Sequence, residues 1–170
     1  MDVRYINPFV KSVSNATLTM LGIEALPLQP LVKNETRASG DISGIIGIAS
    51  AAIYGSVALS MPSETALALY NKMMGDSQTE INGDVRDMIG ELANIVAGSS
   101  KKEMAEQNLS FDISIPTVVV GKNHVISHMG GIPVVVIPFK FGEHRFEMEI
   151  SIKVRNEEKA PVGMAHAHAG

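Results

Sequence analysis

The chain has 170 residues, of which 45% are hydrophobic and 19% charged, a composition typical of one folded domain and not of a disordered chain. The net charge of −4 comes without a block of lysines or arginines, which argues against a nucleic-acid partner and against binding to an anionic membrane. There is no cysteine, so disulfides and thiolate metal sites are excluded, and the first residues lack the apolar block of a signal peptide. These features predict a cytoplasmic protein with one domain over residues 1–155 and a flexible, alanine-rich tail over residues 156–170.

Two kinds of hydrophobic pattern follow one another along the domain. Apolar residues three or four apart indicate helices, whereas short runs rich in isoleucine and valine indicate strands. In chain order, the patterns predict a helix over Val3 to Leu21, a proline-interrupted edge strand over Ala25 to Ala38, buried strands over Ser43 to Ala51 and Ala52 to Met61, a helix from Pro62 to Gly75, a longer helix over Asn82 to Glu106, and strands over Leu109 to Val120, Ile132 to Phe141 and His144 to Val154. The apolar stretch from Ile42 to Met61 is too often interrupted by glycine to be a membrane span.

This order of elements predicts an α/β fold of the α+β type, with a mostly antiparallel sheet of about six strands and the helices packed on it. Gly142 and Glu143 separate the last two strands, which is the length of a hairpin connection. A strand-forming run such as residues 132–139, if it lies near a sheet edge, must be covered or paired to avoid aggregation.

The helix over Asn82 to Glu106 separates an apolar arc from a polar one when successive residues are placed about 100° apart. The apolar arc consists of Val85, Met88, Ile89, Leu92 and Val96, and the opposite arc of Asp84, Asp87, Glu91, Asn94, Gly98 and Lys101. Within the second arc, Asp87, Glu91 and Asn94 form a row with the spacing i, i+4, i+7. The helix is therefore expected to pack by one side and to present this row on the other.

Gly90 and Gly98 flank the polar row, although glycine inside a helix costs about 1 kcal/mol relative to alanine. Close approach of a second protein surface is one reason to keep them, and packing against a neighbouring element of the same domain is another. The row also has a simpler interpretation, because most polar helix faces are only solvated. Asp87 and Glu91 are a like-charged pair four residues apart, however, so this face is not arranged for the stability of the helix.

The pattern Asp87-x-x-x-Glu91-x-x-Asn94, followed by Pro116, resembles the signature of the CheC and CheX chemotaxis phosphatases. The surrounding GDVRDMIGELANIVAGSSK is similar to the active helix of that family. Three other segments are similar to its first helix, its central hairpin and a late strand: INPFVKSVSNATLTMLG, SGIIGIASAAIYGSVALSMP and GGIPVVVIPFKF. The resemblance covers about residues 3 to 154. The first helix has no Glu-x-x-Asn motif, and because CheC proteins often carry two active helices, the single motif favours the CheX branch.

The resemblance implies a phosphatase that hydrolyses the phosphoaspartate of a CheY-like response regulator and so ends a chemotaxis or motility signal. In that family the regulator supplies Mg²⁺ and a lysine, so no cofactor or metal site of the protein's own is expected. Asn94 would orient the attacking water, Glu91 would pair with the regulator's lysine, and Asp87, Gly90 and Gly98 would support partner binding. The family also implies a homodimer joined through sheet edges.

Two other functions stay open. A non-catalytic docking module of the same fold would bind a response regulator or a flagellar switch component without hydrolysis, but the presence of both Glu91 and Asn94 favours the enzyme. A hydrolase that uses Glu91 as a general base would need an electrophile or metal site nearby, and the sequence offers none.

The histidines are weaker candidates. His124 and His128, four residues apart beside a Gly-Gly pair, are predicted to lie in a loop and to be structural or solvated rather than metal-binding. His166 and His168 lie in the predicted tail, where adventitious metal binding is the most that their alanine-rich surroundings suggest.

Overall fold

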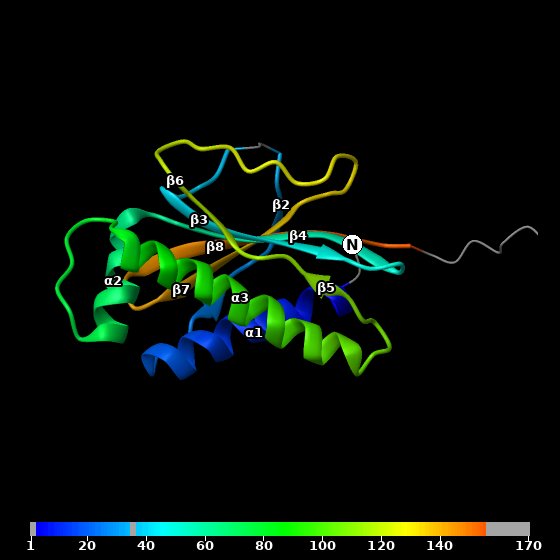
Figure 1. Ribbon diagram of the computed structural model, residues 1–170, viewed down its shortest axis with the longest axis horizontal. Helices are drawn as coiled ribbons and strands as arrows, with labels where there is room; N and C mark the ends of the chain where they lie inside the picture. Colours follow the sequence, from blue (N-terminus) through cyan, green and yellow to red (C-terminus); the bar gives the residue numbers. More distant parts are fainter. Residues whose placement is uncertain (1–2, 35–36, 156–170) are drawn as a thin grey trace, which may run out of the picture.

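The computed structural model describes residues 3–34 and 37–155. The predicted tail, with His166 and His168, lies outside the described residues, so the domain boundary at residue 155 stays a prediction. Within the described ranges, three helices lie on one face of an eight-stranded antiparallel sheet, and the segment over residues 121–134 crosses the other face (Figure 1). The predicted α+β class is confirmed.

The helices are α1 (Val3–Leu21), α2 (Ser63–Met74) and α3 (Gly83–Ala105), close to their predicted bounds. α1 ends where Gly22 adopts a φ of +67° and donates its N–H to the carbonyl oxygen of Leu18 at 2.9 Å. α3 begins after Asn82, whose side-chain oxygen accepts the N–H of Val85 at 3.0 Å.

The strands are β1 (Leu26–Pro27), β2 (Leu31–Val32), β3 (Ile42–Ala49), β4 (Ile53–Met61), β5 (Asp112–Ile113), β6 (Thr117–Val120), β7 (Val135–Phe141) and β8 (His144–Val154). Their order in the sheet is β1-β7-β8-β4-β3-β5, with β2 also paired to β7 and β6 also paired to β3. Every pairing is antiparallel, and the two central strand pairs, β3–β4 and β4–β8, are long ladders of eight residue pairs each.

Two predicted strands are interrupted, which explains why the sheet has eight strands and not six. The edge strand expected over Ala25 to Ala38 consists of β1 and β2, both paired to β7. The strand expected over Leu109 to Val120 consists of β5 and β6, both paired to β3. Pro30 lies in the first gap and Pro116 in the second, and proline has no N–H to continue a ladder.

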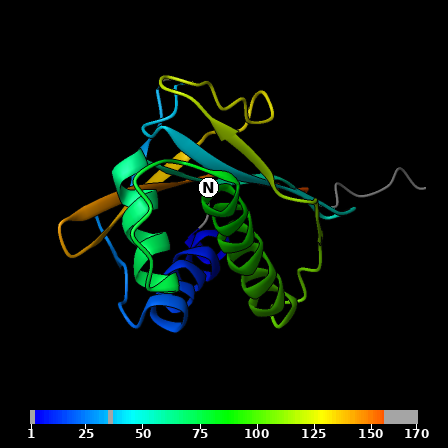
Figure 2. The same ribbon diagram turned by 60° about the vertical axis from the view of Figure 1, so that its left-hand side comes forward.

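Figure 2 shows the helices as a layer on one side of the sheet. The hydrophobic core is made by residues of these helices and of the sheet strands. Its fully buried members include Phe9, Ile89 and Phe139, each of which contributes about 1.5–3 kcal/mol by leaving water. α3 packs directly on β3 at Gly44, where a β-carbon would come within 2.9 Å of the Ile89 carbonyl oxygen. This close packing fixes which side of α3 faces away from the core. No helix among the described residues is long and apolar enough to cross a membrane.

Candidate functional site

The site is built on α3, whose two arcs are oriented as the periodicity predicts. All five residues of the apolar arc are buried against the sheet and the neighbouring helices. On the opposite arc, Asp87 and Glu91 are exposed and Asn94 is half-buried. Because the buried arc is held by core packing, the three polar side chains project from a rigid element, which favours precise positioning.

The three polar side chains have no partner within the described part of the chain. Asp87, Glu91 and Asn94 make no hydrogen bond and no ion pair there. Lys101, farther along the same arc, differs because its ammonium group pairs with Asp112 at 2.9 Å. Two carboxylates and one carboxamide therefore remain available to an incoming molecule.

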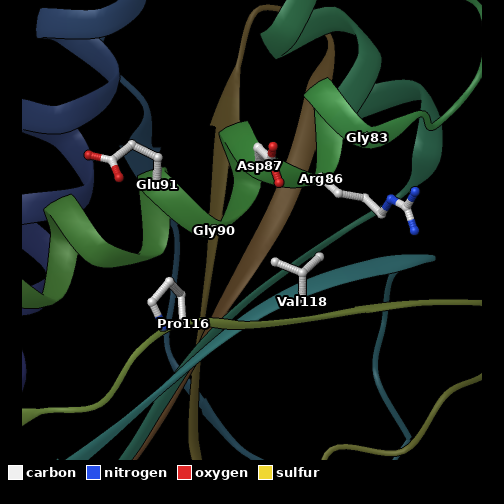
Figure 3. Close-up of a pocket in the computed structure, with 7 residues that line it drawn as sticks. All are labelled: Gly83, Arg86, Asp87, Gly90, Glu91, Pro116 and Val118. Carbon is white, nitrogen blue, oxygen red and sulfur yellow. The ribbon is translucent and has the colours of Figure 1, made fainter.

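A groove of about 490 Å³ runs along this part of α3. It is lined by Gly83, Arg86, Asp87, Gly90, Glu91, Pro116 and Val118 (Figure 3). Pro116 and Val118 project toward the helix from the other wall, while the side chains of Arg86 and Glu91 extend toward opposite ends of the groove (Figure 3). The site thus combines an apolar wall with a charged rim.

The two glycines that flank the row have different surroundings. A β-carbon on Gly90 would come within 3.3 Å of Val118 Cγ2 and 3.8 Å of Pro116 Cγ, so Gly90 serves packing inside the domain. A β-carbon on Gly98 would meet no atom within 4 Å. Of the two explanations that the sequence left open, intramolecular packing therefore applies to Gly90, whereas the surface at Gly98 is open to a second molecule.

The structure brings together Asp87, Gly90 and Glu91 at the groove, and Asn94 follows one turn farther along the helix, outside the residues that line it. Arg86 and Val118 were not predicted as site residues from the sequence. Arg86 is exposed beside the row, and its Nε donates to the carbonyl oxygen of Asn82 at 3.3 Å. Val118 had no local signal, because its place depends on the pairing of β6 with β3.

His124 and His128 lie in the segment that covers the outer face of the sheet, and both have structural partners. His124 contacts Ser43 Oγ through Nε2 and the Gly121 carbonyl oxygen through Nδ1, each at 2.7 Å. His128 contacts Ser56 Oγ through Nδ1 at 2.8 Å and Glu149 Oε2 through Nε2 at 2.9 Å. The loop position and structural role expected for this pair agree with these contacts.

Glu149, which was not predicted from the sequence, is fully buried and forms an ion pair with Lys33 in addition to its contact with His128. Burial by itself would raise the pKa of Glu149, but the hydrogen bonds from His128 and Lys33 outweigh burial and hold the pKa below its usual value. Glu149 therefore links β8 to the 121–134 segment through His128, and to the chain just after β2 through Lys33.

The serine, histidine and glutamate of this network have the connectivity of a hydrolase triad. A cavity of about 190 Å³ adjoins His128 and Lys33, but Ser56 is not among the residues that line it. The observed contacts of the network join the 121–134 segment and Lys33 to the sheet, which is a structural role. Among the described residues, no group of three or more His, Asp or Glu side chains is arranged to hold a metal ion.

Comparison with solved structures defines the class of protein. The chain matches a CheC-like superfamily protein of Shewanella sp. PV-4 with a TM-score of 0.84 and 35% identity, over 90% of this chain and 99% of the other. It also matches the CheX protein of Borrelia burgdorferi, solved as a complex with CheY, BeF₃ and Mg²⁺, with a TM-score of 0.75 and 27% identity, over 88% and 97% of the two chains. The fold is that of the CheC/CheX-like proteins.

Sequence comparison then identifies the family. The family model described as chemotaxis phosphatase CheX matches residues 42–140, which include α3 and both strands beside it. The CheY-P phosphatase CheX of Thermotoga maritima is 32% identical over 154 residues, which are 90% of this chain and 98% of that protein. The chain belongs to the CheX family of chemotaxis phosphatases.

Proposed function

We propose that this protein hydrolyses the phosphoaspartate of a CheY-like response regulator and thereby ends a chemotaxis or motility signal. The observation that carries the proposal is the unpartnered row of Asp87, Glu91 and Asn94 on α3, beside an open groove, in a chain of the CheX family. The relative from Thermotoga maritima that bears the name CheY-P phosphatase supports the choice of substrate.

The chemistry requires positioning more than acid–base catalysis. A water attacks the phosphorus and the bond between phosphorus and the aspartyl oxygen breaks. The products are the aspartate carboxylate and inorganic phosphate, which takes up the oxygen and both protons of the water as H₂PO₄⁻. Such a reaction is accelerated chiefly by holding the water in line and by neutralising charge on the phosphoryl oxygens. A helix that is fixed by core packing suits this task.

Asn94 is the residue that we assign to the water. Its carboxamide offers both an acceptor for a water proton and a donor for a phosphoryl oxygen. Neither function is occupied by a contact within the described residues, and the side chain is half-buried on a rigid helix. These features support an inserted, water-orienting role.

Glu91 is assigned to docking. Its exposed carboxylate has no cationic partner among the described residues, so it is available to pair with a lysine of the regulator. Asp87, one turn earlier, adds negative charge to the same rim of the groove and supports the contact. The open surface at Gly98 would let the regulator's backbone approach the helix.

Mg²⁺ enters the proposal with the regulator and not as a cofactor of this chain. The relative from Borrelia burgdorferi that was solved with CheY, BeF₃ and Mg²⁺ supports this arrangement. Phosphoaspartate and the divalent cation would thus come from one protein, and the carboxamide and the docking carboxylates from the other.

We also propose that the protein is a homodimer joined through a sheet edge. Leu26, Leu31 and Val32, on the outer strands β1 and β2, are exposed apolar residues at one edge. An edge of this kind is usually covered or paired in solution.

The test of the proposed activity is phosphate release from a panel of phosphorylated CheY-like receiver domains with Mg²⁺. At least one receiver is expected to lose its phosphate faster than it does alone. If the protein binds an activated receiver and accelerates no hydrolysis, the docking-module interpretation is correct instead.

A further inference from the structure

Ile115 is the most exposed of the large hydrophobic side chains described, with 86% of its surface accessible. It lies in the short connection between β5 and β6, which runs beside α3 (Figure 1). A single exposed apolar residue is ordinarily unremarkable on a protein surface. Ile115 is a candidate for partner binding because of its position beside α3 and because its backbone is held in place.

Two contacts locate Ile115 relative to the site. Asp112, three residues before it, pairs with Lys101 of α3, and Pro116, the next residue, lies against Gly90. An extended chain rises about 3.3 Å per residue and a helix about 1.5 Å, so one step back from Pro116 corresponds to about two residues along α3. Ile115 therefore lies beside the turn of α3 that carries Asn94.

The backbone holds Ile115 in this exposed position. The N–H of Ser114 donates to the Gly47 carbonyl oxygen at 2.9 Å, and its hydroxyl accepts the N–H of Gly47 at 2.9 Å and donates to the Ile115 carbonyl oxygen at 2.9 Å. On the other side, the ring of Pro116 restricts the backbone. Because this backbone is already held in place, little backbone entropy is lost when a partner covers Ile115.

We propose that Ile115 is an apolar anchor for the receiver domain, an inference that rests on the proposed function. With Pro116 and Val118 it forms the apolar side of a receiver-docking surface, and Asp87, Glu91 and Asn94 form the polar side. The neighbourhood of the groove indicates the occupant: Ile115 directly precedes Pro116, which lines the groove, so a receiver that occupies the groove comes within reach of Ile115. The matching receiver presents an apolar patch next to its phosphorylation site, and the contact sets affinity rather than turnover.

The experiment compares Ile115→Ser, Ile115→Val and Met129→Ser with the wild-type protein. Met129 is also an exposed apolar residue, but it lies in the 121–134 segment on the opposite face of the sheet, so it is a matched control. Binding is titrated with a CheY-like receiver domain charged with BeF₃⁻ and Mg²⁺, and phosphate release is measured with the phosphorylated receiver. Thermal melts check that the exposed substitutions leave folding unchanged.

For Ile115→Ser we expect Kd and KM to rise about tenfold or more, as the loss of one buried isoleucine predicts, with kcat within about twofold of wild type. Ile115→Val and Met129→Ser are expected to bind as wild type does. Unchanged affinity in Ile115→Ser overturns the inference and leaves the proposed function standing. If the wild-type protein binds the receiver without hydrolysing its phosphate, the proposed activity is wrong, and the comparison of Kd values still tests the role of Ile115. If the wild-type protein binds no activated receiver, both the proposed activity and the role of Ile115 are wrong.

Discussion

Gly90 of α3 lies so close to Val118 of β6 that a β-carbon on the glycine would stand 3.3 Å from the valine Cγ2. The missing side chain allows the second wall of the groove to approach the helix, so the shape of the groove depends on this glycine. Gly98, two turns later on the same helix, has no such neighbour. The two positions therefore respond differently to substitution.

Gly90→Leu is expected to destabilise the protein by about 1–3 kcal/mol, because the larger side chain must displace Val118 and Pro116. Gly98→Ala is the matched control on the same helix. It is expected to stabilise the protein by about 0.5–1 kcal/mol, because alanine is the better helix former and its β-carbon meets open space. Urea unfolding measures both, and equal effects at the two positions would contradict the packing role of Gly90.

Asn94→Ala is expected to lower turnover by about 10²- to 10³-fold, the usual effect of removing a group that acts only in the transition state. Binding of a receiver charged with BeF₃⁻ should remain nearly intact. Phosphate release and a binding titration, performed on one preparation, separate the two effects. Near-normal turnover in this variant would show that Asn94 does not position the water.

Glu91→Ala is expected to weaken receiver binding by about tenfold or more, since its carboxylate is proposed to meet a lysine before the chemistry begins. Turnover at subsaturating receiver should fall with affinity. The side chain is exposed and alanine favours helix, so the melting temperature should stay the same. Loss of turnover with unchanged Kd would reassign Glu91 from docking to the chemical step.

Glu149→Gln is expected to cost about 3 kcal/mol of stability at neutral pH, because the substitution leaves the buried ammonium group of Lys33 without its countercharge. Receiver turnover should be unaffected under folding conditions, since the network lies on the face of the sheet opposite α3. Urea unfolding at pH 7 measures this loss of stability. A loss of less than about 0.5 kcal/mol, the usual effect of a surface substitution, would contradict a structural role for Glu149.

Because of the same glutamate, the free energy of unfolding is expected to decrease as the pH is lowered. Its pKa is lower in the folded protein than in the unfolded chain, so its contribution is fully present above about pH 5 and decreases as the pH falls through the folded-state pKa. The stability difference between wild type and Glu149→Gln should therefore narrow as the pH falls below about 5. A difference that stays constant over this range would contradict the charged state assigned to Glu149.

Val32→Glu is expected to convert the proposed homodimer into a monomer, because the new charge would be buried where two sheet edges meet. Leu18→Glu, at an exposed apolar position of α1, is the control and should leave the dimer intact. Sedimentation velocity at micromolar concentration distinguishes the two states. A wild-type protein that sediments as a monomer would remove the dimer from the proposal altogether.

The sequence by itself determined the helices and the direction in which α3 faces. Helical periodicity depends on residues three and four apart, and caps such as Asn82 act on the N–H groups of the next turn. That Asp87, Glu91 and Asn94 face away from the core was therefore predictable without the fold. The strands β3, β4, β7 and β8 were also predictable locally, because each is a run with many apolar residues, continuous or alternating, that a turn bounds in the sequence.

The tertiary structure decided what depends on residues far apart in the chain. Only the pairing of β5 and β6 with β3 placed Pro116 and Val118 against Gly90 and left Gly98 uncovered. Only the order of strands brought Lys33 and His128 to Glu149, which is why a buried charged network escaped detection in the sequence. The physical reason is that periodicity reports which side of an element faces the core, whereas the identity of its neighbours is set by strand order and register.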